Sequence, residues 1–391
     1  MILKKAVYIA DAKRLAIGKF LGTLSDVPAV NLSTPILNYY KNKYPFLKNK
    51  TDQIIIGNVL SAGVGMNLAR MISYQNSFSF KIPAMTLNYV CGSGLRSIIE
   101  AAKSIVIGES NIVIAGGVES MSNAPYLLSN ARKGYRFGNN QLIDSIYHDG
   151  LYCSLAQSVM GETAELITQK YKITRENQDI YALNSHKQAL LAIAGGDFTT
   201  QIVGYPLQES DFINDEQPRK DTTLEKLAKL KPIFKKSGSV TAGNSSSLND
   251  GAALALLLSE RAIKRYHTKP VARIIAYNYL AIKPQYMGIA PYYSISQLLV
   301  ENKMRIDDVD HFEINEAFAA QILAVEKLLN LNPAKVNING GAIALGHPLG
   351  ATGAILLTKL VYNLISKNKK FGIVSLCIGG GQGISLLIEK L

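Results

Sequence analysis

The segment "NYVCGSGLRSIIEAAKSI" (residues 88–105) decides how the fold is interpreted, because an extended run passes through a bend of small residues into a helical pattern. Cys91 lies in this bend, surrounded by glycine and serine. Gly92 and Gly94 allow another group to approach the backbone closely, since glycine has no side chain. The segment therefore predicts a strand, a tight bend and a helix, with a thiol where the helix begins.

The same order of elements occurs twice along the chain. In the first half, "TDQIIIGNVL" (51–60) precedes the bend and "NIVIAGGVES" (111–120) follows the helix. In the second half, "IDDVDHFEIN" (306–315) comes before "GHPLGATGAILLTKL" (346–360), and "FGIVSLCIGGGQG" (371–383) comes after it. A repeated order of this kind predicts an internal duplication of about 120 residues.

Short apolar runs alternate with helical patterns in both halves, which is typical of an α/β fold with a parallel or mixed sheet. The runs that predict strands are Ala6–Ala10, Gln53–Ile56, Asn111–Ala115, Ala272–Tyr277, His311–Ile314 and Gly372–Ile378. The patterns that predict helices in the two halves are Gly94–Ile107, Glu316–Asn330 and Thr352–Ile365.

The middle of the chain, residues 121–246, has a different character. It contains helical patterns over 163–171 and 175–194, followed by the polar loop "QESDFINDEQPRKDTT" (208–223). We interpret it as an insertion that folds over a site. The predicted domains are then an N-terminal domain of residues 1–120 with 247–269, the inserted loop domain of residues 121–246, and a C-terminal domain of residues 270–391.

Composition excludes several classes of protein. With 48% hydrophobic and 18% charged residues among 391, the chain is long and apolar enough for a large core. Three scattered cysteines are too few for a disulfide framework or a zinc site, so we expect free thiols and no metal. The net charge of +13 is compatible with nucleic-acid binding, but the sequence contains no known nucleic-acid-binding motif. No apolar run reaches the ~18 residues of a membrane span, and no signal peptide is recognisable. We expect a cytoplasmic protein without a membrane or nucleic-acid partner.

Three residues in the repeated bends have reactive side chains. A thiol at a helix start has a lowered pKa, because free N–H groups and the helix dipole favour the thiolate, so Cys91 is expected to be reactive rather than an inert core residue. If the halves face each other, His347 lies opposite it and completes an activated pair. Cys377 precedes three glycines whose N–H groups could form an oxyanion hole, although strand cysteines are often silent.

Six motifs, in order along the chain, resemble signatures of the thiolase family. They are "CGSG", "GGVESMSNAPYLL", "SGSVTAGNSSSLNDGAA", "NEAFAAQ", "GHPLGATG" and "CIGGGQG". The resemblance implies the thiolase fold, in which two duplicated α/β domains with facing sheets form five layers, plus an inserted loop domain. It also implies homotetramers built as dimers of dimers.

The resemblance further implies a reversible Claisen condensation of two acetyl-CoA molecules to acetoacetyl-CoA and CoA, through an acetyl group on Cys91. His347 would take the proton of the thiol, and Cys377 would move the proton of the methyl carbon. Asn315 would hold a water that, with His347, stabilises the enolate oxygen. The N–H groups of Cys91 and Gly379 would hold the oxyanion.

No permanently bound cofactor is implied, because coenzyme A enters as substrate. By resemblance, Arg219 lies near the adenine and phosphates of CoA, and Ser246 lies beside its pantetheine. Apolar positions that would line the pantetheine tunnel and the acyl pocket are Leu151, Met160, Phe234, Ala242, Met287, Ala317 and Phe318.

The sequence leaves open the length of the acyl chain that the protein accepts. The stretches "SMSNAPYLL" and "CIGGG" favour an acetoacetyl-CoA thiolase, whereas Val159, where many such enzymes have histidine, favours a degradative thiolase for longer 3-ketoacyl chains. A non-catalytic lipid-binding relative would have lost one of the four reactive side chains, and all four are present. A cysteine protease would not explain the second cysteine in a glycine hairpin or the duplicated halves.

Overall fold

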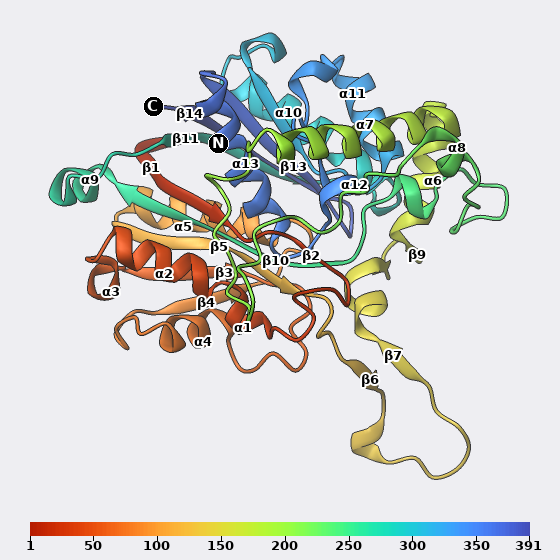
Figure 1. Cartoon of the computed structure of the whole chain (residues 1–391), viewed down its shortest axis with the longest axis horizontal. Helices are drawn as coiled ribbons and strands as arrows, with labels where there is room; N and C mark the ends of the chain where they lie inside the picture. Colours follow the sequence, from red (N-terminus) through yellow and green to blue (C-terminus); the bar gives the residue numbers. More distant parts are fainter.

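The computed structural model describes residues 1–391, and one ten-stranded sheet runs through it (Figure 1). The strand order is β12-β13-β14-β11-β1-β10-β5-β3-β4, with β2 paired to β10. Strands of the first half are β1 (Ile2–Arg14), β2 (Gly18–Lys19), β3 (Gln53–Gly57), β4 (Ala84–Leu87), β5 (Ile112–Ser120) and β10 (Asn249–Ser259). Strands of the second half are β11 (Ala272–Ala281), β12 (His311–Ile314), β13 (Phe371–Ile378) and β14 (Gln382–Lys390).

Strand β1 belongs to both halves of the sheet. It pairs antiparallel with β10 from Val7 to Arg14, and with β11 from Ile2 to Ile9. The halves are therefore joined along one strand and face each other across two helices. The predicted facing arrangement is confirmed, and the join through β1 is a feature that the sequence did not predict.

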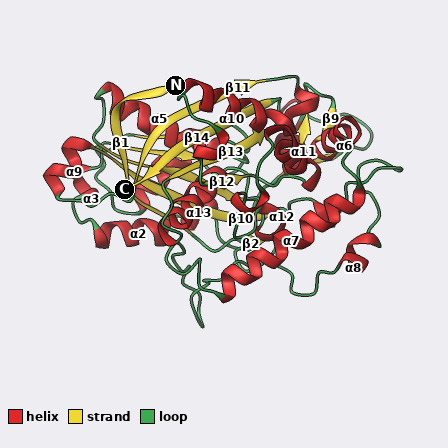
Figure 2. Cartoon of the chain, turned by 90° about the horizontal axis from the view of Figure 1, so that it is seen from above, coloured by secondary structure: helices red, strands yellow, loops and turns green.

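The two helices that lie between the halves of the sheet are α5 (Ser93–Ile107) and α13 (Thr352–Ser366). Figure 2 shows the helices that surround the strands. The apolar side chains of α5 and α13 merge with one face of each half of the sheet into a single core. Residues of this core include Ile98, Ala102, Leu357, Leu360, Val113, Leu257, Val374 and Leu386. The residues between these on the same strands point toward the outer faces of the sheet, because successive side chains of a strand lie on opposite faces.

Helices also cover the two outer faces, which completes five layers. The first half is covered by α1 (Ala29–Leu32), α2 (Thr34–Lys43), α3 (Leu47–Lys50), α4 (Leu68–Gln75) and α9 (Glu260–Tyr266). The second half is covered by α10 (Ala290–Glu301) and α11 (Ala319–Leu329). The predicted α/β class and all the strands and helices predicted for the two halves are confirmed, with shifts of a few residues at their ends.

Residues 121–246 contain short strands, three α-helices and three shorter helical turns. The helices are α6 (Met160–Tyr171), α7 (Arg175–Ala194) and α8 (Leu224–Ala228), and the strands are β6 (Tyr126–Leu128), β7 (Leu142–Asp144), β8 (Tyr152–Cys153) and β9 (Ser158–Val159). Strands β6 and β7 form a hairpin arm that projects from the body (Figure 1). The division of the chain into three domains stays a prediction. None of the helices has the length and apolar character needed to span a membrane.

Candidate active site

The bend that carries Cys91 is held in a strained shape by its own hydrogen bonds. Val90 has a φ of +46°, a left-handed conformation that costs a β-branched residue on the order of 1–3 kcal/mol. Ser93 stabilises this turn, because its Oγ accepts from the N–H of Tyr89 at 2.8 Å and donates to the carbonyl of Val90 at 2.7 Å. The backbone thus turns sharply before α5 and presents the Cys91 thiol at the turn.

The small residues around the thiol bring the second half of the molecule close. A Cβ on Gly92 would lie 2.5 Å from Cδ1 of Ile378, and one on Gly94 would lie 2.8 Å from the carbonyl oxygen of Gly350. Both contacts are shorter than side-chain carbons allow. Glycine is required at position 94, where the contact is with backbone, whereas at position 92 the flexible end of Ile378 would have to move. The prediction that these glycines admit a close approach is confirmed.

His347 is buried in the corresponding bend of the second half. Its Nδ1 lies 2.7 Å from Oγ1 of Thr352, and its Nε2 lies 3.3 Å from the amide nitrogen of Asn315. Its backbone N–H donates to Oδ1 of Asn249 at 2.9 Å, which fixes the residue against β10. Burial lowers the pKa of the imidazole to about 4, so His347 is neutral at physiological pH.

Asn315 is completely buried directly after β12, where its N–H donates to the carbonyl of Ser375 at 2.9 Å. Its amide nitrogen is directed at His347, while its Oδ1 has no hydrogen-bond partner within the protein. Buried polar atoms are normally paired, so an unpaired acceptor here is suited to a water or a substrate group. This fits the role that the sequence predicted for Asn315.

The resting state of the Cys91 thiol differs from the sequence prediction. Burial raises its pKa to about 11, and the negative charge of Glu119 adds to the effect, although the N–H groups of Gly379 and Cys91 itself oppose it. The predicted lowering of this pKa is therefore wrong. Cys91 precedes the first residue of α5, and the imidazole of His347 is neutral, so no positive charge compensates for desolvation.

Cys377 lies at the end of β13 and is buried beside the first thiol. Burial raises its pKa far above the ordinary value, and the neighbouring Cys91 raises it further. The two N–H groups that act on the Cys91 sulfur, those of Cys91 and Gly379, are the two that the sequence nominated as oxyanion donors. The site thus combines two adjacent protonated thiols and two backbone donors, with a neutral imidazole in the wall of the cavity that Met160 and Phe318 also line.

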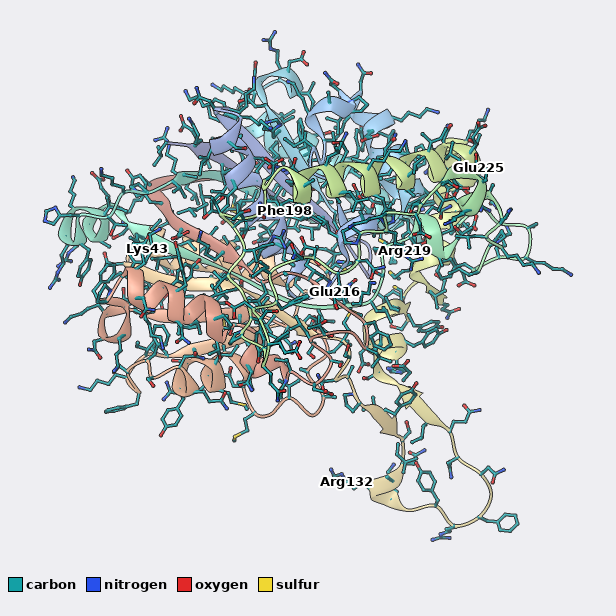
Figure 3. All side chains as sticks on the ribbon, in the orientation of Figure 1. Lys43, Arg132, Phe198, Glu216, Arg219 and Glu225 are labelled. Atoms are coloured by element: carbon teal, nitrogen blue, oxygen red, sulfur yellow. The ribbon has the colours of Figure 1, made fainter.

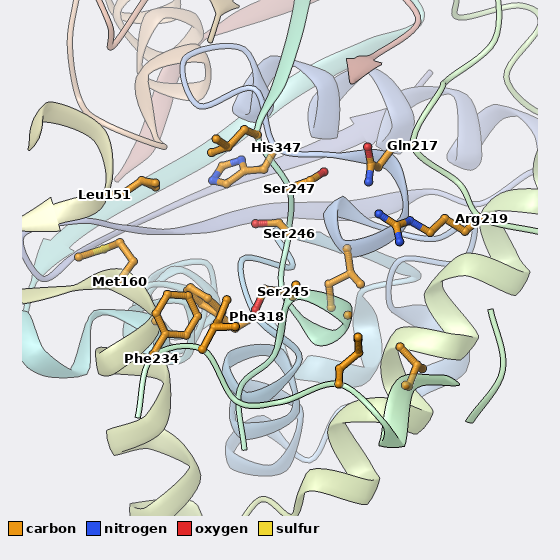
Figure 4. Close-up of a pocket in the computed structure, with 18 of the residues that line it drawn as sticks. Leu151, Met160, Gln217, Arg219, Phe234, Ser245, Ser246, Ser247, Phe318 and His347 are labelled. Atoms are coloured by element: carbon orange, nitrogen blue, oxygen red, sulfur yellow. The ribbon is translucent and has the colours of Figure 1, made fainter. Parts of the chain in front are cut away.

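A cavity of about 800 Å³ has His347 in its wall (Figure 4). Of the residues predicted to contact CoA, seven line it: Arg219, Ser246, Leu151, Met160, Phe234, Ala242 and Phe318. The other two, Met287 and Ala317, are not in its wall. They are buried behind it, in an apolar cluster with Met160 and Phe318.

The cavity changes character along its length. Met160, Phe234 and Phe318 form an apolar end, while Arg219 lies on the opposite side with Gln217 (Figure 4). Polar residues of the middle are Ser245, Ser246 and Ser247, and the charged residues at the outer end include Asp221 and Lys226, which form an ion pair of 2.7 Å. The shape suits a ligand with an anionic end and a narrow polar chain.

Several residues of the site were not predicted from the sequence. His186 on α7 lines the cavity, and its Nδ1 accepts the N–H of Arg219 at 3.2 Å. Burial and the charge of Arg219 lower the pKa of His186 to about 4. Gln217 also lines the cavity, two residues before Arg219 in the polar loop. Only the position of Gln217 beside a nominated residue could have suggested it.

Glu119 is a second omission, although it lies inside the quoted motif "GGVESMSNAPYLL". Its buried carboxylate accepts N–H groups from the Asn58 side chain at 2.8 Å, from Val59 and Leu60 at 3.1 Å, and from Gly350 at 2.7 Å. It therefore ties the loop after β3 to the loop that contains His347. Burial raises its pKa to about 7. No group of three or more His, Cys, Asp or Glu side chains is arranged to hold a metal ion.

Comparison with known proteins gives a consistent result over the whole chain. The thiolase N-terminal domain matches residues 7–261, and the thiolase C-terminal domain matches residues 268–390. A probable acetyl-CoA acyltransferase of Staphylococcus aureus (strain N315) is 44% identical over 389 residues, which cover 98% of this chain and 99% of the relative.

Two crystal structures are similar throughout. The acetyl-CoA acetyltransferase of Bacillus anthracis has a TM-score of 0.96 at 41% identity and covers 100% of both chains. The human mitochondrial 3-ketoacyl-CoA thiolase, in complex with CoA, has a TM-score of 0.97 at 39% identity and covers 100% of this chain and 99% of its own. The relatives thus carry both names that the sequence left open.

Proposed function

The chain belongs to the thiolase family and is an acyltransferase, and from this premise we propose that it joins two acetyl-CoA molecules to acetoacetyl-CoA and CoA, reversibly, through an acetyl group on Cys91. The observation that carries the proposal is that groups from both halves of the molecule lie at the Cys91 sulfur. The N–H of Gly379 acts on the Cys91 sulfur, and Cys377 packs against Met160 and Phe318 of the cavity wall. His347, which contacts the buried Asn315, lines the same cavity.

The first half-reaction follows from the neutral state of the thiol and the imidazole. As the sulfur of Cys91 attacks the thioester carbonyl, its proton passes to His347, and the N–H groups of Cys91 and Gly379 stabilise the oxyanion. The tetrahedral intermediate then collapses, and the departing CoA sulfur takes the proton back. Because proton transfer accompanies attack, a stable thiolate is not required beforehand.

The second half-reaction needs a base for the methyl carbon of the next acetyl-CoA. Cys377 lies beside Cys91, and once its own proton has left to solvent, its sulfur is the group proposed to take the proton of the methyl carbon. A water held by Asn315 and by the Nε2 lone pair of His347 donates to the enolate oxygen and stabilises it. The enolate carbon then attacks the acetyl carbonyl, and the bond to the Cys91 sulfur breaks to release acetoacetyl-CoA. The Cys91 thiolate that leaves takes the proton held by Cys377, which restores the Cys91 thiol and leaves Cys377 as the thiolate that began the step.

The assignment of the two thiols is tested by the position of the acetyl group. With Cys91→Ala, intact-protein mass spectrometry after brief exposure to acetyl-CoA should find no added acetyl group. With Cys377→Ala, acetyl transfer to Cys91 should survive while condensation and thiolysis fall by about 10²–10⁴-fold, the usual contribution of a general base. Acetyl on Cys377 or Cys153, or full thiolysis by Cys377→Ala, would overturn the assignment.

Short acyl chains are favoured by the packing around the sulfurs. Cys377 lies in a buried cluster with Met160, Met287 and Phe318, and Cys91 packs against buried side chains that include Leu349. Acetoacetyl-CoA should therefore give a higher kcat/KM in thiolysis than a C8 3-ketoacyl-CoA. The opposite ranking would support the degradative thiolase, the activity for which the human 3-ketoacyl-CoA thiolase is named.

The proposed direction of CoA places its phosphates at the Arg219 end and its pantetheine along Ser246. Arg219 is exposed, so its contact is worth about 0–1 kcal/mol, and Arg219→Ala should raise KM only a few-fold. Val159 also lines the cavity, and Val159→His should improve KM more than kcat. A fall in kcat with KM unchanged in Arg219→Ala would contradict this direction.

We place the enzyme in the cytoplasm as a homotetramer, with the hairpin arm as an intersubunit contact. The arm exposes Tyr126, Leu128, Phe137 and Leu142, an unusual density of apolar side chains on a projecting element. It also carries Arg132, far from Arg219 (Figure 3). Replacing Phe137 and Leu142 by Asp should reduce the mass measured by light scattering to that of a dimer, and an unchanged tetramer would contradict the role.

A further inference from the structure

Thr352 holds the side of the His347 ring that faces away from Asn315. The Oγ1 of Thr352 lies 2.7 Å from Nδ1 of His347 and 2.8 Å from the carbonyl oxygen of Pro348. Both side chains are buried, with 2% of Thr352 and 6% of His347 exposed, so water does not compete for these hydrogen bonds. On the other side of the ring, the amide nitrogen of Asn315 lies 3.3 Å from Nε2.

The proton count of this chain favours one arrangement. A threonine hydroxyl has a single proton, and a carbonyl oxygen can only accept. The hydroxyl of Thr352 therefore donates to Pro348 and accepts from Nδ1–H of His347. The amide of Asn315, which donates, then meets the lone pair of Nε2.

We propose that Thr352 is a positioning residue that keeps His347 in its Nδ1–H form, so that Nε2 is the atom that receives the Cys91 proton. The inference deepens the proposed function and rests on it. During acyl transfer the S–H bond of Cys91 breaks and its proton moves to the lone pair of Nε2, which gives up the long 3.3 Å contact with the Asn315 amide. The Nδ1–H of the resulting imidazolium still donates to Thr352, which disperses the charge, and the proton leaves with the CoA sulfur.

The chain offers a matched set of variants. Thr352→Val removes the hydroxyl at nearly constant volume, and Thr352→Ser restores it. Thr358→Val is the control, because Thr358 is an equally buried residue of the same helix whose Oγ1 donates only to the carbonyl of Ala354, at 2.9 Å. Thr352→Val should lower kcat by about 10- to 100-fold with KM little changed, as when an outer hydrogen bond to a functional histidine is lost.

Thr352→Ser should stay within a few-fold of the natural protein, and Thr358→Val should keep full kcat. Equal losses in Thr352→Val and Thr358→Val would mean that only helix packing was damaged, and a full kcat in Thr352→Val would also overturn the proposal.

The tautomer itself can be read by ¹⁵N NMR of histidine-labelled protein, with the His347 signals identified by their absence in His347→Gln. We expect a protonated Nδ1 and an unprotonated Nε2 in the natural protein, and a mixture in Thr352→Val. A protonated Nε2 in the natural protein would refute the proposal. This reading needs no turnover, so it separates failure of the Thr352 role from failure of the proposed reaction, and it stands even if Thr352→Val does not fold.

Discussion

Asn58 and Asn315 occupy equivalent places in the two halves, directly after the first strand of each repeated unit. Asn58 donates to the Glu119 carboxylate at 2.8 Å and to the carbonyl of Val118 at 3.1 Å. Asn315 instead directs its amide at His347, across 3.3 Å. In the two halves, equivalent asparagines therefore have different partners: Asn58 links two loops through Glu119, and Asn315 contacts an imidazole.

The strands that follow the enclosed helices differ in the same way. Near the end of β5, Glu119 accepts four N–H groups and is saturated. Near the end of β13, the Cys377 thiol receives a hydrogen bond from its own backbone N–H alone and otherwise lies among apolar side chains beside the Cys91 thiol. Under the proposed function, the first half supplies the nucleophile on a turn held by hydrogen bonds, while the second half supplies the groups that move protons.

The two thiols offer the sharpest test of this division. Because burial raises the pKa of Cys91 to about 11, its alkylation by iodoacetamide in Cys377→Ala should accelerate about tenfold per pH unit, or about 1,000-fold between pH 7 and pH 10. Cys377 in Cys91→Ala should react more slowly at every pH. Peptide mass spectrometry measures both rates. A plateau for Cys91 near pH 7 would mean a resting thiolate and would restore the sequence-based expectation.

The two asparagines should separate activity from stability. Asn315→Ala should lower kcat by about 10²–10³-fold, the usual effect of removing one donor at a developing oxyanion, with little loss of stability. Asn58→Ala leaves Glu119 without one donor and should cost about 1–3 kcal/mol of unfolding free energy, with little change in kcat in the fraction that remains folded. Steady-state kinetics and urea unfolding measure the two effects, and a reversed pattern would break the comparison.

The smallest effect is the pH dependence that Glu119 contributes. Its pKa is raised from 4.5 to about 7 by burial, so the unfolded chain loses this proton first. Stability therefore falls as pH rises from about 4.5 to about 7 and levels off above, by about 1–3 kcal/mol in all. Glu119→Gln should lack this component in urea titrations at pH 5 and pH 8. Parallel pH profiles for the two proteins would show that Glu119 is ionised throughout.

Much of the fold was predictable because its signals are local. The patterns that predicted α5, α13 and β12 are continuous runs, and each element appears within a few residues of its predicted bounds. Strands β10 and β14 were not among the predicted strands, and both are needed to form the continuous sheet.

Within the site, residue identity was easier to predict than residue state. Cys91, His347 and Asn315 stand in recognisable motifs, whereas the pKa of Cys91 depends on burial by groups from both halves. The contact of His347 with Thr352 follows from the turn between them, which no spacing rule revealed. Met287 is buried behind the cavity wall rather than in it, because the direction of a side chain depends on the tertiary packing around it.

The shared strand β1 has a consequence for synthesis on the ribosome. It ends at Arg14, whereas its partners β10 and β11 begin at Asn249 and Ala272. At roughly 5–20 residues per second, the nascent strand waits on the order of ten seconds or longer with both edges unpaired. Contacts of such long sequence separation also slow the final collapse. Newly made chains should therefore depend on chaperones in proportion to how slowly the segment between these strands is translated.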